Sequence, residues 1–218
     1  MTNANLTEDG QDQAELFDVM PAPSFKGIQI APEVVAPLAK ANLNGIEFPT
    51  ISRSEANSTG AWHRSVGVWL YTKEGDILLQ KRSLLKDTNP GRWQMSVAGH
   101  VTSGDSVHST ILNEAAEELG LSSESLAKLQ FLGLLASQEH GSTDRFGEYL
   151  DAEYKFIYLC ETDREIALTL NALEISEVRW EPIETVFANF KGGNPAYCPM
   201  TVEYAEFSQA QIKAKLAE

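Results

Sequence analysis

The stretch "AGHVTSGDSVHSTILNEAAEELGL", residues 98–121, constrains the fold of this chain more than any other segment. In it, a loop of small residues leads into a segment whose apolar residues lie three and four positions apart. These residues are Val107, Ile111, Leu112, Ala115, Ala116 and Leu119. The spacing predicts an amphipathic helix over residues 105–119, and Gly120 is a typical C-terminal stop. Such a helix needs a packing partner for its apolar face.

Strand patterns on both sides of the helix supply that partner. Partly alternating apolar runs over residues 65–72, 75–83 and 95–101 are separated by turn sequences. Three further runs follow the helix, at residues 129–140, 153–161 and 175–183. We expect a long polar loop over residues 141–151 and a final helix over residues 200–218. This order of elements predicts a mixed α/β layered domain.

The 218 residues are expected to form one domain with extensions. Residues 1–14 carry almost no large apolar side chain, so we expect a mobile tail there. Residues 15–60 are interpreted as an N-terminal extension packed on the core, with a helix in "APEVVAPLAKANL" that Pro37 bounds or interrupts. The main domain then covers residues 61–195, and residues 196–218 form the C-terminal helix.

The formal net charge of −14 argues against a general affinity for nucleic acid or anionic membranes. No apolar run approaches the roughly 18–20 residues of a membrane span, and the polar, acidic start is unlike a signal peptide. We therefore expect a cytoplasmic protein that binds neither nucleic acid nor membrane. Two cysteines, Cys160 and Cys198, are too few for a disulfide framework or a zinc cluster. The oligomeric state stays open, and a homodimer is compatible with the sequence.

Three carboxylates, Glu114, Glu117 and Glu118, fall on one side of the predicted helix, because residues three and four apart are neighbours at about 5–6 Å. A solvated acidic face is the ordinary interpretation of such a group. The glycines of the preceding loop, however, allow backbone carbonyls to approach a ligand closely. Since Mg²⁺ prefers carboxylates, waters and phosphate oxygens as ligands, the triplet beside this loop favours a metal site.

The same stretch resembles the motif of the Nudix hydrolases, G-x5-E-x7-R-E-U-x-E-E-x-G-U, where U is a bulky apolar residue. The matching residues are Gly99, Glu114, Glu117, Glu118, Gly120 and Leu121. The resemblance implies a Nudix-type α/β/α sandwich with a mixed β-sheet and a loop–helix–loop metal site. It also implies Mg²⁺, or alternatively Mn²⁺, held by the carbonyl of Gly99 and by the three glutamates.

Two positions depart from the motif. Asp105 stands where the family has its first Glu, and Asn113 stands where the family has Arg. In the family this pair braces the loop–helix–loop. The exchange replaces a charged clamp with, at best, an Asp–Asn hydrogen bond. A Nudix-fold ligand-binding or regulatory module with weak or no catalysis is therefore one alternative.

The resemblance extends beyond the motif to the Nudix branch that borders the type I isopentenyl-diphosphate isomerases and includes plant Nudix proteins. His63, His100 and the pair Asp151 and Glu153 match positions of the isomerase metal site. Ala98, however, stands at the position of the isomerase cysteine. Without that thiol, an isomerase-like enzyme is the second alternative and hydrolysis is favoured.

The resemblance thus implies a Mg²⁺-dependent hydrolase of a small-molecule substrate, cleaving the diphosphate bond of a nucleoside diphosphate derivative or a related organic diphosphate. Catalysis is assigned to Glu114, Glu118 and Glu153, with Glu114 and Glu153 as the two candidates for the general base. The residues expected to contact the substrate are Arg82, Lys86 and His100.

Overall fold

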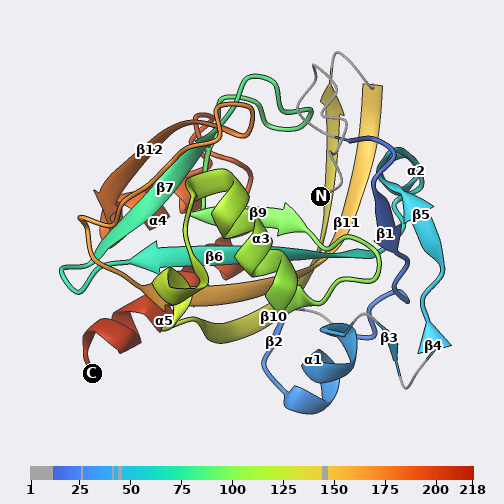
Figure 1. Cartoon of the computed structure of the whole chain (residues 1–218), viewed down its shortest axis with the longest axis horizontal. Helices are drawn as coiled ribbons and strands as arrows, with labels where there is room; N and C mark the ends of the chain where they lie inside the picture. Colours follow the sequence, from blue (N-terminus) through green and yellow to red (C-terminus); the bar gives the residue numbers. More distant parts are fainter. Residues whose placement is uncertain (1–11, 26, 41, 44–45, 144–146) are drawn as a thin grey trace.

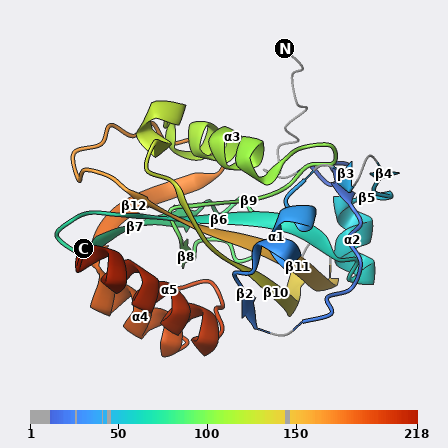
Figure 2. The same cartoon turned by 90° about the horizontal axis from the view of Figure 1, so that it is seen from below.

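A mixed eight-stranded sheet runs through the protein and carries helices on both faces (Figures 1 and 2). The computed structural model describes residues 12–25, 27–40, 42–43, 46–143 and 147–218. Most of the tail predicted over residues 1–14 therefore lies outside the described residues, and its mobility stays a prediction.

The strands of the sheet are β2 (Ile28–Gln29), β6 (His63–Tyr71), β7 (Asp76–Arg82), β8 (Trp93–Gln94), β9 (Val97–His100), β10 (Gln130–Thr143), β11 (Gly147–Glu161) and β12 (Ile175–Pro182). Their main order is β12-β7-β6-β11-β10-β2, with β8 paired to β7 and β9 paired to β6. The central pair, β6 and β11, is parallel, and the other pairs are antiparallel. The sheet is therefore mixed, as the family resemblance implies.

The helix α3 (Val107–Leu119) covers one face of the sheet, and α4 (Ile183–Lys191) and α5 (Val202–Leu216) cover the other (Figure 2). Two separate apolar cores result, one under α3 and one under α4 and α5. The α/β/α sandwich predicted from the resemblance is confirmed. A short 3₁₀ turn (Ser123–Leu126) follows α3. Among the described helices, none has the length and apolar character needed to cross a membrane.

The segment before the sheet forms β1 (Leu16–Asp18), α1 (Pro32–Leu38), β3 (Asn42–Leu43), β4 (Ile46–Glu47), β5 (Thr50–Ser52) and α2 (Arg53–Thr59). β1 pairs with β5 at one end of the main sheet (Figure 1). Phe17 is fully buried and Met20 is 3% exposed, so this segment contributes side chains to the interior. Pro37 lies inside α1, in its last turn.

The helix α3 begins at Val107 rather than at residue 105, because Ser106 caps it. The side chain of Ser106 accepts a hydrogen bond from the backbone N–H of Ser109, which satisfies one of the free donors of the first turn. At the other end, Gly120 adopts a left-handed conformation with φ of 68°, as a C-terminal glycine commonly does.

The prediction of a long loop over residues 141–151 is wrong. β10 continues to Thr143 and β11 starts at Gly147, so the two strands form one long hairpin. Backbone pairing continues through polar residues, for example between Gly141 and Tyr149, because ladder hydrogen bonds do not need apolar side chains. The tyrosine ring lies directly over the α-carbon of Gly141, which has no side chain to displace it.

Two helices were missing from the sequence interpretation although each has a local signal. α2 carries a capping box, in which Ser52 and Glu55 bond each other's backbone N–H groups. α4 buries Ile183, Val186, Phe187 and Phe190, whose spacing is helical. The strand predicted over residues 175–183 includes the first residue of α4, so the start of this helix was not recognised.

Candidate active site

The three glutamates of α3 differ in how far the protein buries them. Glu118 is 3% exposed, Glu114 is half-buried, and Glu117 is exposed. Glu114 lies against β9, where a Cβ added to Gly99 would come within 2.0 Å of its Oε1 atom. A side chain at this position would force Glu114 to move, so the glycine of the motif allows this close approach.

Glu118 is the most firmly held of the three. Its Oε2 atom accepts hydrogen bonds from Gln80 Nε2 at 3.0 Å and from the backbone N–H of Ala98 at 3.2 Å. These donors come from β7 and β9, so the sheet fixes the orientation of a carboxylate that α3 supplies. The remaining carboxylate oxygen has no hydrogen bond within the described residues and is free to take another partner.

Burial raises the pKa of all three carboxyls. Burial raises the pKa of Glu118 to about 7, against an opposing effect of Lys86. The pKa of Glu114 is raised further by the neighbouring charges of Glu118 and Glu117. The pKa of Glu117 is raised by partial burial and by Glu174. A divalent cation would relieve this repulsion, and the all-oxygen donor set suits Mg²⁺ or Mn²⁺.

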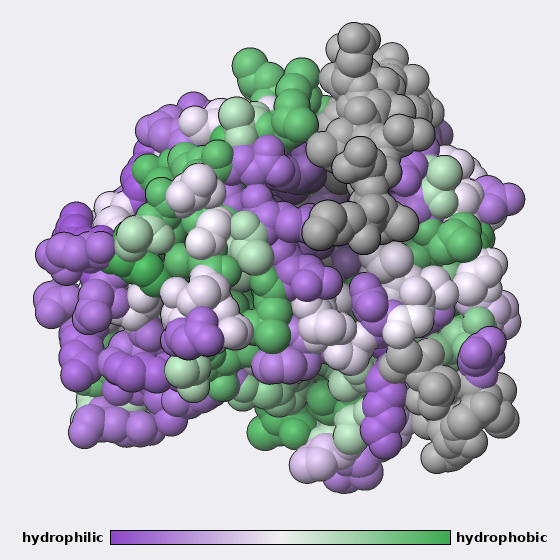
Figure 3. Space-filling view, viewed as in Figure 1, coloured by the Kyte–Doolittle hydropathy of each residue, from purple (hydrophilic) through white to green (hydrophobic). Residues whose placement is uncertain are grey.

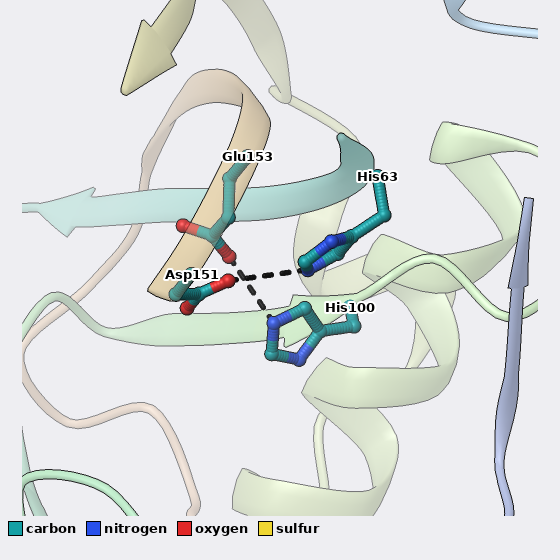
Figure 4. A group of neighbouring side chains, drawn as sticks. All are labelled: His63, His100, Asp151 and Glu153. Atoms are coloured by element: carbon teal, nitrogen blue, oxygen red, sulfur yellow. Dashed lines mark ion pairs between the residues drawn. The ribbon is translucent and has the colours of Figure 1, made fainter. Parts of the chain in front are cut away.

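A second polar cluster lies where β6 begins and β9 ends, beside β11, and consists of His63, His100, Asp151 and Glu153 (Figure 4). One ligand atom from each of the four lies within 4.8 Å of the others. His63 Nε2 is 3.3 Å from Asp151 Oδ1, and His100 Nε2 is 3.2 Å from Glu153 Oε1. The four residues therefore form two crossed histidine–carboxylate pairs.

The protonation of His63 follows from its contacts. Its Nδ1 atom lies 2.9 Å from the carbonyl of Ala61, so this nitrogen carries a proton and Nε2 faces Asp151. A neutral ring would then place a lone pair against a carboxylate. Burial lowers the pKa of His63, but Asp151, with Glu153 and the carbonyl of Ala61, outweighs burial and raises it overall. His63 Nε2 and Asp151 Oδ1 lack a well-aligned hydrogen-bond partner, as does His100 Nε2, so the space between them fits a proton or a cation.

In the other half of the cluster, the charge of Glu153 is already neutralised. The guanidinium of Arg53 lies 3.2 Å from His100 Nδ1 and can only donate, so the neutral ring of His100 holds its proton on Nε2, toward Glu153. Burial, with Arg53, lowers the pKa of His100. Glu153 is also paired with Lys155 at 2.8 Å. Burial alone would raise the pKa of Glu153, yet Lys155 and His100 hold it well below its usual range.

The N-terminal segment covers this cluster. The ring of Phe17 stacks on His63 and on His100, with centroids 4.8 and 5.0 Å apart. Arg53 lies over the same phenyl ring and forms an ion pair with Glu15. The extension thus supplies side chains to the immediate surroundings of the second cluster.

Both clusters line one cavity of about 670 Å³. Its wall includes all three glutamates of α3 and also His100, Asp151 and Glu153. Figure 3 shows hydrophilic side chains gathered around a hollow on the face that carries α3. His63 is buried behind this wall, with no exposed surface.

The two predicted phosphate-binding cations also line this cavity, but both have partners within the protein. Arg82 donates to the carbonyl of Thr88 at 3.0 Å and to Gln94 Oε1 at 3.3 Å. Lys86 forms an ion pair with Glu174 and points into the acidic region. A phosphate group would therefore compete with Glu174 for Lys86.

Several cavity residues were not predicted. Lys155 alternates with Asp151 and Glu153 along β11, so the period-2 pattern of a strand could have identified it. Arg53 and Glu15 come from the extension, and no local pattern connects them to the site. Cys198 also lines the cavity, far in sequence from Ala98, and burial raises the pKa of its thiol to about 11.

This fold, with carboxylates on a helix that follows a glycine loop, defines a Nudix domain. The family model described as the NUDIX domain matches residues 61–200. The chain belongs to the Nudix hydrolase family.

Similar proteins include both Nudix hydrolases and isopentenyl-diphosphate isomerases. Nudix hydrolase 3 of Arabidopsis thaliana is 34% identical over 154 residues, covering 69% of this chain but only 19% of the plant protein. An isopentenyl-diphosphate Delta-isomerase of Citrobacter koseri is 28% identical over 149 residues, covering 68% of this chain and 78% of the isomerase. The crystal structure of DR0079 from Deinococcus radiodurans superimposes with a TM-score of 0.57 at 18% identity, over 88% of this chain and 98% of that one, which supports the fold.

Proposed function

We propose that this protein is a Mg²⁺-dependent Nudix pyrophosphatase that cleaves the diphosphate bond of a nucleoside diphosphate derivative or a related small organic diphosphate, in the cytoplasm. The single observation that carries the proposal is the composition of the cavity. Three carboxylates and the close-packed Gly99 line one part of its wall, and Arg82 and Lys86 line another. Such a site can take cations and an anionic substrate together.

Mg²⁺, or Mn²⁺ in its place, would be held by Glu114, Glu117, Glu118 and the carbonyl of Gly99. When bound, the metal supplies positive charge against the diphosphate oxygens. Gln80 and the backbone N–H of Ala98 keep Glu118 oriented. Arg82 and Lys86 bind the remaining phosphate charge, and His100 borders the substrate.

Of the two candidates for the general base, the contacts favour Glu114. Both carboxylate oxygens of Glu153 are engaged, one with His100 and the other with Lys155. Glu114 has no hydrogen bond within the described residues and lies directly beside Gly99. We therefore assign proton acceptance from the attacking water to Glu114 and a charge-balancing role to Glu153.

The test is a substrate panel with Mg²⁺, containing nucleoside diphosphate derivatives, free nucleotides, prenyl diphosphates and thiamine diphosphate. Products made in ¹⁸O-labelled water and identified by mass spectrometry show which phosphorus the water attacks. Glu118→Gln is the site variant, and Glu206→Gln, an exposed residue on α5, is the matched control. We expect turnover that Glu118→Gln abolishes and Glu206→Gln retains. Turnover that survives Glu118→Gln would show that the assigned site is wrong.

One specific observation keeps an isomerase-like activity as a second candidate. The cluster of His63, His100, Asp151 and Glu153 is assembled in this structure at the positions predicted from the isomerase resemblance. Against it, Ala98 offers no thiol, and His100 Nε2 is occupied by its proton toward Glu153. Migration of the double bond in isopentenyl diphosphate, followed by proton NMR, would overturn the hydrolase proposal.

A binding module without turnover is the third candidate. No hydrogen bond joins the side chains of Asp105 and Asn113, both of which lie in the described part of the chain, so the clamp of the family motif is absent. Tight binding of a diphosphate in calorimetry, without hydrolysis of any member of the panel, would favour this candidate.

A further inference from the structure

The loop that leads into α3, residues 102–105, is held by contacts from outside the Nudix motif. Since Asp105 and Asn113 share no hydrogen bond, the motif itself does not fix this loop. The loop nevertheless connects Gly99 on β9 to the glutamates of α3, so its position sets how these two halves of the site meet.

The first of these contacts is a buried guanidinium. Arg64, on β6, is 1% exposed, and one of its amino groups donates to Asp18 Oδ2 at 2.6 Å and to the backbone carbonyl of Asp105 at 3.1 Å. Its other amino group donates to the carbonyl of Lys40 at 2.7 Å, just after α1. One side chain therefore connects the core strand, the extension and the end of the loop.

The extension contacts the loop from the other side. Asp18 is 3% exposed, and its Oδ1 atom accepts a 2.6 Å hydrogen bond from Ser103 Oγ. The backbone N–H of Ser103 donates to the carbonyl of Leu16 at 2.7 Å. Thr102 Oγ1 donates to Glu15 at 2.7 Å. β1 therefore runs along the loop and bonds it through both backbone and side chains.

We propose that Arg64 and Asp18, with Ser103, form a brace that replaces the missing motif clamp and positions the glutamates of α3 against Gly99. A buried ion pair with charge-assisted hydrogen bonds is well suited to this role, because moving either partner leaves the other charge buried and unpaired. Arg64 and Asp18 are positioning residues, since they act through the loop. The extension is in this way part of the metal site, although no residue of β1 belongs to the motif.

The direct measurement is amide hydrogen exchange of residues 101–106 in the metal-free protein, which needs no substrate. We expect faster exchange of this segment in Asp18→Asn, which removes the charge, and in Ser103→Ala, which removes one hydrogen bond and leaves the ion pair intact. Tyr154→Phe is the matched control, because it removes a 2.8 Å hydrogen bond from the core to Pro21 of the same extension without touching the loop.

The second measurement is calorimetric titration with Mg²⁺. Loss of an outer contact that orients metal ligands typically weakens metal binding by about 10–100-fold, and we expect the lower end for Ser103→Ala and about the upper end for Asp18→Asn. Adding Asp105→Glu with Asn113→Arg restores the motif clamp. In the Asp18→Asn background this pair is expected to return both the exchange rate and the Mg²⁺ affinity toward the original values.

The inference concerns the same site as the proposed function, but both readouts are independent of turnover. If the substrate panel fails while loop exchange and Mg²⁺ affinity respond as expected, only the proposed function is lost. Exchange in residues 101–106 that rises no more in Asp18→Asn than in Tyr154→Phe would overturn the brace. If Asp105→Glu with Asn113→Arg does not correct the exchange rate and Mg²⁺ affinity of Asp18→Asn, the brace does not replace the motif clamp.

Discussion

The glutamates of α3 and the cluster of His63, His100, Asp151 and Glu153 line one cavity, but they differ in how their negative charge is compensated. The glutamates repel one another, and burial raises the pKa of Glu118 to about 7. In the other cluster Glu153 is paired with Lys155, and Lys155 and His100 hold the pKa of Glu153 low. The glutamates of α3 need external positive charge, whereas Glu153 already has a cation within the protein. This difference supports the proposal that divalent cations bind at the glutamates of α3.

The largest effect expected from this comparison is on turnover. Glu118→Gln should lower kcat about a thousand-fold, which corresponds to ~4 kcal/mol of lost electrostatic stabilisation of the transition state. Glu153→Gln should lower it only about ten-fold, because its charge is balanced inside the protein. Steady-state kinetics on the best substrate of the panel measures both. Equal losses in the two variants would remove the distinction between the clusters.

The next effect is on stability. Lys155→Met leaves Glu153 buried without its cation, and breaking a buried pair costs about 3–5 kcal/mol. Urea unfolding monitored by circular dichroism measures this. The matched control is Lys128→Met, whose lysine is 60% exposed in its pair with Glu161 and should cost at most about 1 kcal/mol. Similar losses for the two would mean that Lys155 does not compensate Glu153.

A third effect is the pH dependence of the metal-free protein. The folded-state pKa of Glu118 is about 7, against an ordinary value of 4.5. Between these values the folded protein binds more protons than the unfolded chain, so this group lowers stability as pH rises from 4.5 to 7. The loss amounts to up to about 3 kcal/mol. Chemical unfolding across this range should show the slope, and Glu118→Gln should flatten it. A slope that is unchanged in Glu118→Gln contradicts this assignment.

The smallest effect concerns the thiol in the cavity. Cys198 has a raised pKa of about 11, so it stays protonated at neutral pH and is a weak nucleophile. Cys198→Ala should change kcat/KM of hydrolysis by less than about two-fold, within the range of a modest packing change. A loss of a hundred-fold or more would indicate that the thiol takes part in chemistry, as an isomerase-like mechanism requires.

Much of the fold followed from local patterns. The 3.6-residue period gave α3, and alternating apolar runs gave the central strands, because each pattern directly reflects one buried face. The hairpin of β10 and β11 was mistaken for a loop because its outer part is polar on both faces. Pairing there depends on the partner strand, which a single run of residues does not reveal.

The sequence by itself determined the Nudix motif, the helix with its three glutamates, and the glycine that Glu114 approaches. Spacing along one element decides which side chains share a face, so these features are local. Only the tertiary structure decided that Arg53 donates to His100 and that Asp18 and Arg64 meet at the loop. Those contacts join residues 47 and 46 positions apart in the sequence, and burial in the folded state strengthens the interaction of their charges.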